Sequence, residues 1–233
     1  MKKKLNLAFA LASLLSVQTM HAQSVDDIVD KYIASLGGKE KLLSLKTVRM
    51  EGNMSVQGTD VTLVITKEHM VGTRADIGIM GVNNYQVVTP DKGVMFMPVQ
   101  GMTAPADMPV EQVKAAQTQL DLQGALLNYK DKGTKVALLG KEKVDKDEAY
   151  NMQLTFKNGI ISNYYISAST YRLVKSSTNR NVNGQNMLIE TTYNDYKQNA
   201  DGYWFPYSVT SIQGETTYDK IETNKPVDAS IFK

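Results

Sequence analysis

The sequence predicts a mainly β fold (α+β), in which a single curved antiparallel sheet forms an incomplete β-barrel with helices covering its concave face. Most of the chain alternates apolar and polar residues with a period of two, in short runs separated by turn signals at roughly ten-residue intervals. Two stretches, residues 24–36 and 107–130, have helical spacing instead. A sheet of roughly ten strands or more accumulates enough twist to curl, so helices before and within the strands can cover its hollow side.

The first helix is predicted over residues 24–36. In SVDDIVDKYIASLGG the apolar residues fall on one helical face. Ser24 and Asp27 have the spacing of a capping box, and Gly37 with Gly38 ends the helix. A second short helical turn is expected in KEKLLSL.

From residue 46 the period changes to two. In KTVRMEGNMSV, Val48, Met50 and Met54 alternate with polar residues, which is typical of a strand with one solvent-exposed face. Turn signals such as PDKG, NG at 158–159 and NADG separate the later runs. Further strands are expected at about 60–71, 71–80, 84–89, 93–99, 134–144, 148–157, 160–167, 171–179, 186–196, 203–213 and 215–223.

Residues 107–130 interrupt the strands with helical spacing. We predict one helix, or a helix pair split near Gly124, with Asp107 as the cap and Gly133 after its end. No repeat, linker or low-complexity segment divides the chain, so residues 23–233 are expected to form a single domain.

The N-terminus has the pattern of an export signal. Lys2, Lys3 and Lys4 precede the apolar run LNLAFALASLLSV, which is too short to span a bilayer as a stable helix. We expect cleavage near Ala22, so that residues 1–22 are the signal peptide. Cleavage removes three lysines and no acid, and it lowers the 26 basic residues to 23 against 24 acidic ones. The charge of the mature chain therefore indicates no nucleic-acid partner.

The chain contains no cysteine. It therefore forms no disulfide and cannot carry a cysteine-linked lipid anchor. We expect a protein that is soluble in a bacterial periplasm after signal cleavage.

The residues needed for catalysis are scarce. After signal removal His69 is the one remaining histidine, beside Glu68 near a strand end, and we interpret it as a solvated surface residue. The motifs G-x-S-x-G, G-x-G-x-x-G and G-x-x-x-x-G-K-[ST] do not occur. The sequence therefore predicts no catalytic residue, no metal site and no cofactor, and it favours a protein that is not an enzyme.

The candidate ligand-binding residues come from the apolar faces of the strands. Eight of the 12 methionines lie between Met50 and Met108, and methionine serves either as core filler or as an adaptable cavity lining. Both interpretations stay open. If the barrel holds a ligand, strand parity predicts that one set of side chains faces the cavity: Met50, Met54, Leu63, Ile65, Met95, Met97, Met152, Leu154, Phe205 and Tyr207.

The pattern leaves two points open: which face of the 93–99 strand points inward, and what role the following loop has. On the 93–99 strand, Val94 and Phe96 offer an equally apolar alternative face. The segment VMFMPVQGMTAPADMP leaves a strand and continues as a loop that carries the apolar residues Met102 and Met108. Such residues indicate a lid or docking loop, unless they pack down on the sheet.

The stretch DGYWFP at 201–206 holds the only Trp of the chain. Its aromatics either fill a core or line a cavity. Because Pro206 cannot donate a ladder hydrogen bond, its strand is expected at a sheet edge or with the proline facing a gap, as at the rim of an open barrel.

Three stretches together resemble the outer-membrane lipoprotein-sorting family, the LolA/LolB-like superfamily of periplasmic lipoprotein carriers and acceptors. They are IVDKYIASLGGKEKLLSLKTVRMEG at the mature start, LLGKEKVDKDEAYNMQLTFKNG with YYISASTYRLVKSS in the centre, and DGYWFPYSVT…DASIF at the end. The resemblance implies an incomplete barrel whose mouth is covered by helices. It also implies a cavity that binds and releases acyl chains by lid opening, with a role in lipoprotein sorting and outer-membrane biogenesis.

The family's carriers hold the lid shut with an arginine inside the cavity, a role that neither Arg49 nor Arg74 matches here. The expected partners are acyl chains of lipids or lipoproteins, with a membrane-protein partner in the cell envelope as a further candidate, and the expected state is a monomer. Two alternatives remain: a structural or protein-interaction module with a filled barrel, and a lipid-processing hydrolase.

Overall fold

The computed structural model describes residues 24–56, 58–182 and 185–233. The predicted signal peptide at residues 1–22 lies outside these described residues. Within them the helices are α1 (Val25–Ser35), α2 (Lys39–Leu43) and α3 (Val110–Gln117), with 3-10 turns η1 (Pro98–Gln100) and η2 (Ala229–Phe232). The strands are β1 (Thr47–Val56), β2 (Thr59–Glu68), β3 (Gly72–Ile79), β4 (Val82–Val88), β5 (Gly93–Phe96), β6 (Ala106–Asp107), β7 (Lys135–Val144), β8 (Asp147–Thr155), β9 (Ile161–Ser167), β10 (Leu173–Val182), β11 (Gln185–Gln198), β12 (Trp204–Ser211) and β13 (Gly214–Thr223).

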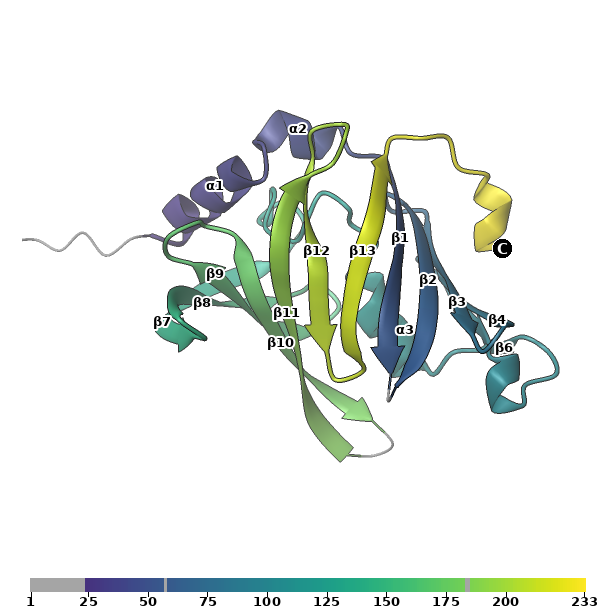
Figure 1. Ribbon diagram of the computed structural model, residues 1–233. Coiled ribbons are helices and arrows are strands. Elements are labelled where there is room, and N and C mark those ends of the chain that lie inside the picture. The colour runs from purple at the N-terminus through teal and green to yellow at the C-terminus, as the bar shows by residue number, and fades with distance from the viewer. Residues whose placement is uncertain (1–23, 57, 183–184) are drawn as a thin grey trace, which may run out of the picture.

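All these strands belong to one antiparallel sheet. Its order is β6-β5-β4-β3-β2-β1-β13-β12-β11-β10-β9-β8-β7, with 13 strands in the described part of the chain. Strands β6 and β7 are the two edges and do not pair, so the sheet is open (Figure 1). This confirms the predicted fold class: a curved antiparallel sheet that does not close.

The topology explains how a cavity can form. Strands β1 and β13 pair in the middle of the sheet, so each half of the sheet extends from there to one edge. The chain must then pass from edge strand β6 to the opposite edge strand β7. It does so through α3 and residues 118–134, and α3 lies behind β1 and β13 in Figure 1. The connection between the edges therefore covers the hollow of the sheet.

Helix α1 forms as predicted. The side chain of Ser24 accepts a hydrogen bond from the backbone N–H of Asp27, and the Asp27 side chain accepts one from the backbone N–H of Ser24, which completes the capping box. Gly37 has a φ of 109°, which residues with a side chain rarely adopt, and the helix stops there. The buried residues Ile28 and Val29 pack with Met152, Leu154 and Ile166 of the sheet.

The prediction for residues 107–130 is wrong in extent. Helix α3 ends at Gln117, and the remaining residues form turns. The Asp121 side chain accepts a hydrogen bond from the backbone N–H of Gln123 at 3.1 Å, a local bond that competes with helix continuation. Positive φ angles at Gly124 and Asn128 bend the chain further. The leucines of this stretch are buried although it is not helical: Leu120, Leu126 and Leu127. Their spacing therefore comes from turns whose leucine side chains pack into the interior.

The cap predicted at Asp107 is also wrong. Asp107 belongs to β6 and pairs with Val94, while Pro109 occupies the N-cap position of α3. Strand β5 ends at Phe96, earlier than the predicted 99, because Met97 leads into η1 at Pro98.

The strand that contains Pro206 is interior, so the predicted edge position is wrong. Strand β12 lies between β11 and β13. Its pairing with β13 covers only Ser208 to Ser211, so the preceding residues have no ladder partner there. The second predicted environment, a proline that faces a gap in the pairing, is the one found.

Candidate functional site

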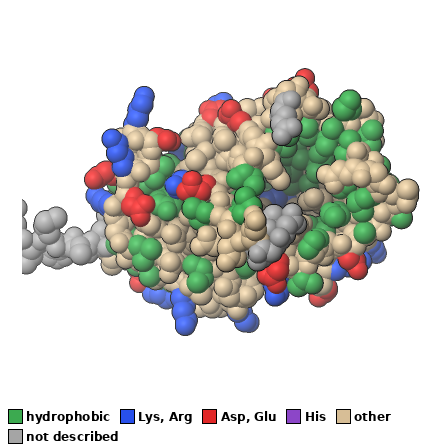
Figure 2. Space-filling view, turned by 90° about the horizontal axis from the view of Figure 1, so that it is seen from below, with side chains coloured by type: hydrophobic (Ala, Val, Ile, Leu, Met, Phe, Trp, Pro, Cys, Tyr) green, Lys and Arg blue, Asp and Glu red, His purple; other side chains and the backbone are tan. Residues whose placement is uncertain are grey.

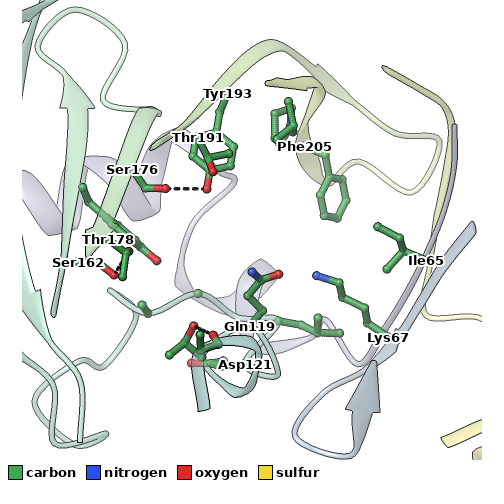
Figure 3. A pocket seen from close by; sticks show the side chains of 18 of the residues that line it. Ile65, Lys67, Gln119, Asp121, Ser162, Ser176, Thr178, Thr191, Tyr193 and Phe205 are labelled. Atoms are coloured by element: carbon green, nitrogen blue, oxygen red, sulfur yellow. Dashed lines mark hydrogen bonds between the residues drawn. The ribbon is translucent and has the colours of Figure 1, made fainter. Parts of the chain in front are cut away.

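The concave face of the sheet holds a cavity of about 410 Å³. Strands β1 and β2 form one wall, β9 to β11 form the facing wall, and α3 with residues 118–125 lies between them (Figure 3). Figure 2, which views the molecule from below relative to Figure 1, shows a hollow surrounded by hydrophobic side chains. A cavity of this size lies within the range of small-molecule binding sites.

The wall from β1 and β2 is apolar. Val48 and Met50 of β1 and Ile65 of β2 line it, and Phe205 and Val209 of β12 continue it. The register explains why these side chains share a face: Met50 pairs with Ile65 across the β1–β2 ladder. The same row continues through Ala75 and Gln86 to Met95.

The facing wall is rich in hydroxyl groups. The hydroxyls of Ser162 and Thr178 lie 2.6 Å apart, and those of Ser176 and Tyr193 lie 3.0 Å apart (Figure 3). Burial raises the pKa of the Tyr193 phenol above its ordinary value, and it raises the pKa of Tyr218, which lines the cavity from β13, to about 12. These phenols therefore stay neutral at physiological pH and serve as polar, uncharged lining.

The segment between the walls, residues 118–125, is tied down at several points. The backbone N–H of Met70 donates to the carbonyl of Leu120 at 2.9 Å, and the backbone N–H of Leu122 donates to His69 Nδ1 at 3.2 Å. The ammonium of Lys132 lies 2.5 Å from Asp121 Oδ2 and 2.9 Å from the carbonyl of Gly124. His69 and Lys132 thus hold the segment that covers the cavity.

A second hollow of about 680 Å³ lies beyond this segment. Thr118, Asp121 and Ala125 of the segment line both spaces, as does Phe156 after β8. The segment is therefore a thin partition, and its displacement would join the two spaces.

Two cations line the cavity. The ammonium of Lys67 projects from β2 into it (Figure 3), and Arg180 lines it from β10. Burial lowers the pKa of both groups below their ordinary values. The single acid that lines the cavity, Asp121, is already paired with Lys132 and lies 3.7 Å from His69 Nδ1.

Of the ten predicted ligand-binding residues, the structure places Met50, Ile65 and Phe205 in the cavity lining. The other seven lie outside it. Met152 and Leu154 are fully buried in the core under α1, and Tyr207 packs against the cluster around Tyr203. Leu63 and Met97 are also buried, while Met54 and Met95 are partly buried.

The predicted lid residues Met102 and Met108 lie beside β5 and do not line the cavity. The backbone N–H of Met108 donates to the carbonyl of Gly93 at 2.9 Å, and its side chain is buried. The Met102 sulfur lies 3.3 Å from the backbone nitrogen of Met97. Both residues therefore fold down on the sheet.

The aromatic run at 203–205 has three different environments. Tyr203 is buried in the core, where its hydroxyl lies 2.7 Å from that of Ser44. Phe205 lines the cavity. Trp204 is covered by the guanidinium of Arg172, 3.8 Å from the ring centre.

Sequence reasoning missed Lys67, Arg180 and the partition. Lys67 has the same strand parity as Leu63 and Ile65, so a charged residue on an apolar face was the available signal. Arg180 gave no such signal, because Ser176 and Thr178, which share its strand parity, are themselves polar. Residues 118–125 reach the cavity only through the tertiary path between the two sheet edges, which no local pattern indicates.

No protein-family model matches this chain, and no curated protein matches its sequence. Solved structures do match. A LolA superfamily protein from Nitrosomonas europaea has a TM-score of 0.55 and 14% identity over 89% of this chain and 96% of its own. The chain has a LolA-like fold.

Two further structures support this assignment. A domain assigned as an outer membrane lipoprotein-sorting protein from Vibrio parahaemolyticus has a TM-score of 0.53 and 14% identity, covering 88% of this chain and 94% of its own. A DUF1329 family protein from Desulfovibrio piger has a TM-score of 0.52 and 10% identity, covering 90% and 97%. The resemblance predicted from sequence is therefore confirmed at the level of the LolA-like fold.

Neither a membrane-spanning helix nor a metal site is found in the described ranges. None of their helices is long and apolar enough to cross a membrane. Within the same residues, no group of three or more His, Asp or Glu is placed to hold a metal ion.

His69 is not the solvated surface residue predicted. Its side chain is 21% exposed, and Nδ1 accepts the Leu122 N–H, so the imidazole is neutral with its proton on Nε2. Burial lowers the pKa of His69 below 6.5, and the charges of Lys46 and Lys132 add to this, whereas Asp121 opposes it. Protonation would add a proton at Nδ1 and break the bond to the partition.

We therefore expect the stability of the protein to fall as the solution is acidified. Because the pKa of His69 is lower in the folded chain than the 6.5 of the unfolded one, the unfolded chain binds more protons as the pH drops through that value. The free energy of unfolding should thus decrease from about pH 7.5 to pH 5 in urea titrations. His69→Asn keeps an acceptor for the Leu122 N–H and does not titrate, so its decrease should be smaller. Identical pH profiles for the two proteins would show that His69 is not responsible.

Proposed function

We propose that this protein is a non-catalytic carrier or receptor of the bacterial cell envelope that holds an acyl chain, from a lipid or a lipidated protein, in the concave cavity. The observation that carries the proposal is the cavity of about 410 Å³, whose wall from β1 and β2 is apolar except for Lys67. The LolA-like fold supports it, since one similar structure is assigned to outer membrane lipoprotein sorting.

The energetics favour an acyl ligand. Burial of one methylene contributes about 0.8 kcal/mol, so ten methylenes contribute about 8 kcal/mol before ordering costs. An apolar wall such as that of Val48, Met50 and Ile65 provides this without a fixed pattern of polar contacts. Binding and release then require only displacement of the partition, residues 118–125, and no bond is made or broken.

The cellular setting follows from the signal pattern. With residues 1–22 removed on export, the protein would act in the periplasm as a monomer. Its role would be in lipoprotein sorting and outer-membrane biogenesis, with a membrane-protein partner in the cell envelope to supply or receive the ligand.

A protein-interaction module on the same fold is the second candidate. It is favoured by Met152 and Leu154, whose side chains fill part of the concave side beneath α1. A module with a filled barrel would bind no acyl compound saturably, so one experiment separates the two functions.

The test is titration of a neutral fluorescent acyl probe with matched variants. Wild type should bind the probe saturably at micromolar concentration, and Ile65→Trp should weaken binding at least about tenfold because the indole occupies cavity volume. Thr62→Trp is the control, since Thr62 is exposed on the opposite face of the same strand. Absence of saturable binding by wild type would favour the interaction module.

A further inference from the structure

Lys67 is a charged residue on the apolar wall of the cavity. It is the penultimate residue of β2 and pairs with Val48 of β1, which lines the same wall. Figure 3 shows its ammonium reaching inward past Ile65 toward Gln119. The side chain therefore presents three N–H donors to the interior of the cavity.

The ammonium has no internal counter-ion. Among the described residues, Lys67 Nζ has neither a hydrogen-bond nor an ion-pair partner. Asp121, the acid that lines the cavity, forms its ion pair with Lys132, whose Nζ lies 2.5 Å from Asp121 Oδ2. Lys67 is half-buried, and a partly desolvated charge without a partner is costly, so desolvation lowers the pKa of its ammonium. An anion that entered the cavity would remove this cost.

Arg180 is a second cation in the same condition. Its Nε is buried and has no hydrogen-bond partner in the described part of the chain, although the guanidinium stays charged. Five successive antiparallel pairings separate β2 from β10, so the two strands run in opposite directions. Lys67 and Arg180 lie near the C-terminal ends of these strands and hence toward opposite ends of the sheet. The field of the whole cavity is therefore positive.

We infer that the cavity is selective for single-chain amphiphiles with an anionic head group, a carboxylate or a phosphate, and that Lys67 Nζ binds this head group. The acyl chain then lies along the wall of Met50, Ile65 and Phe205, with the head group at the Lys67 ammonium near Gln119. The inference rests on the proposed function, and it adds the chemical class of the ligand. An anion supplies the counter-charge that the protein itself lacks at Lys67.

The experiment is competition against the neutral fluorescent acyl probe. The competitors share one C16 chain: hexadecanoate, the matching lysophosphatidate and the neutral monoacylglycerol. Wild type should prefer at least one of the anions over the neutral compound by about tenfold or more, as expected for a charge-assisted hydrogen bond. The anion that competes better identifies the head group as carboxylate or phosphate.

Variants of Lys67 assign the preference to this side chain. Lys67→Met should lower the ratio of anionic to neutral affinity to about one, while Lys67→Arg should keep most of it. Lys46→Met is the matched control because Lys46 is exposed just before β1, and its ratio should equal that of wild type. Urea unfolding of Lys67→Met confirms that the variant is folded, since methionine suits the apolar wall.

The outcomes separate this inference from the proposed function. If all three compounds compete equally with wild type, the inference is overturned and the acyl-binding function stands. If none of them competes and the probe itself does not bind, the proposed function fails. If acetate or inorganic phosphate alone competes as well as the C16 anions, the site is a simple anion site, which also overturns the inference.

Discussion

Replacing Met152 with alanine is expected to lower the free energy of unfolding by about 2–5 kcal/mol. The Met152 side chain is 0% exposed and packs among Ile28, Val29 and Leu126, so its truncation leaves a cavity between α1 and the sheet. Urea denaturation measures the change.

The matched control is Met80→Ala. Met80 is 82% exposed in the turn between β3 and β4, so its truncation should change stability by no more than about 0.5 kcal/mol. The pair also tests the two roles considered for methionine, because a core filler affects stability and a solvent-exposed residue does not. Equal, small effects at both positions would show that Met152 is not part of a packed core.

The second large effect is expected at Gly52, where alanine should destabilise the protein by about 1–3 kcal/mol or more. A Cβ added there would lie 2.2 Å from the carbonyl oxygen of Thr217 and 2.9 Å from the Cα of Tyr218. The β1–β13 register shifts between Glu51 and Gly52, and this irregularity brings the β13 backbone close. Because the clash is with backbone, the central pairing of the sheet must open to relieve it.

Gly78→Ala provides the comparison for Gly52→Ala. Its added Cβ would lie 2.3 Å from the Thr62 hydroxyl oxygen, which is the end of an exposed side chain that can rotate away. The loss in thermal or urea stability should therefore be much smaller than at Gly52. Similar losses for both variants would mean that the β1–β13 approach is not the constraint.

The fold was predictable because its signals are local. Alternation in β1 and β2 and the capping box of Ser24 with Asp27 depend on neighbouring residues, and they assign the strand faces and the first helix correctly. The outcome for residues 107–130 differs because helical spacing cannot distinguish a long helix from turns anchored by Leu120, Leu126 and Leu127.

The site was less predictable for a related reason. Strand parity identifies the inward face but not which part of that face is covered. Met50 and Ile65 border the cavity, whereas Met152 has an inward position and is buried by α1. That difference is set by where α1 and residues 118–125 pack, which is a tertiary property. Lys67 is visible in the sequence as a break in an apolar pattern, whereas its lack of a partner depends on the tertiary structure.

Acyl-chain binding in the concave cavity is best tested by native mass spectrometry of the mature protein purified from its host and then equilibrated with the C16 compounds. We predict a complex with one acyl ligand per protein chain, largely lost in Ile65→Trp and retained in Thr62→Trp. Only ligand-free masses for wild type, in the purified sample and after equilibration at micromolar ligand, would contradict an acyl-binding function.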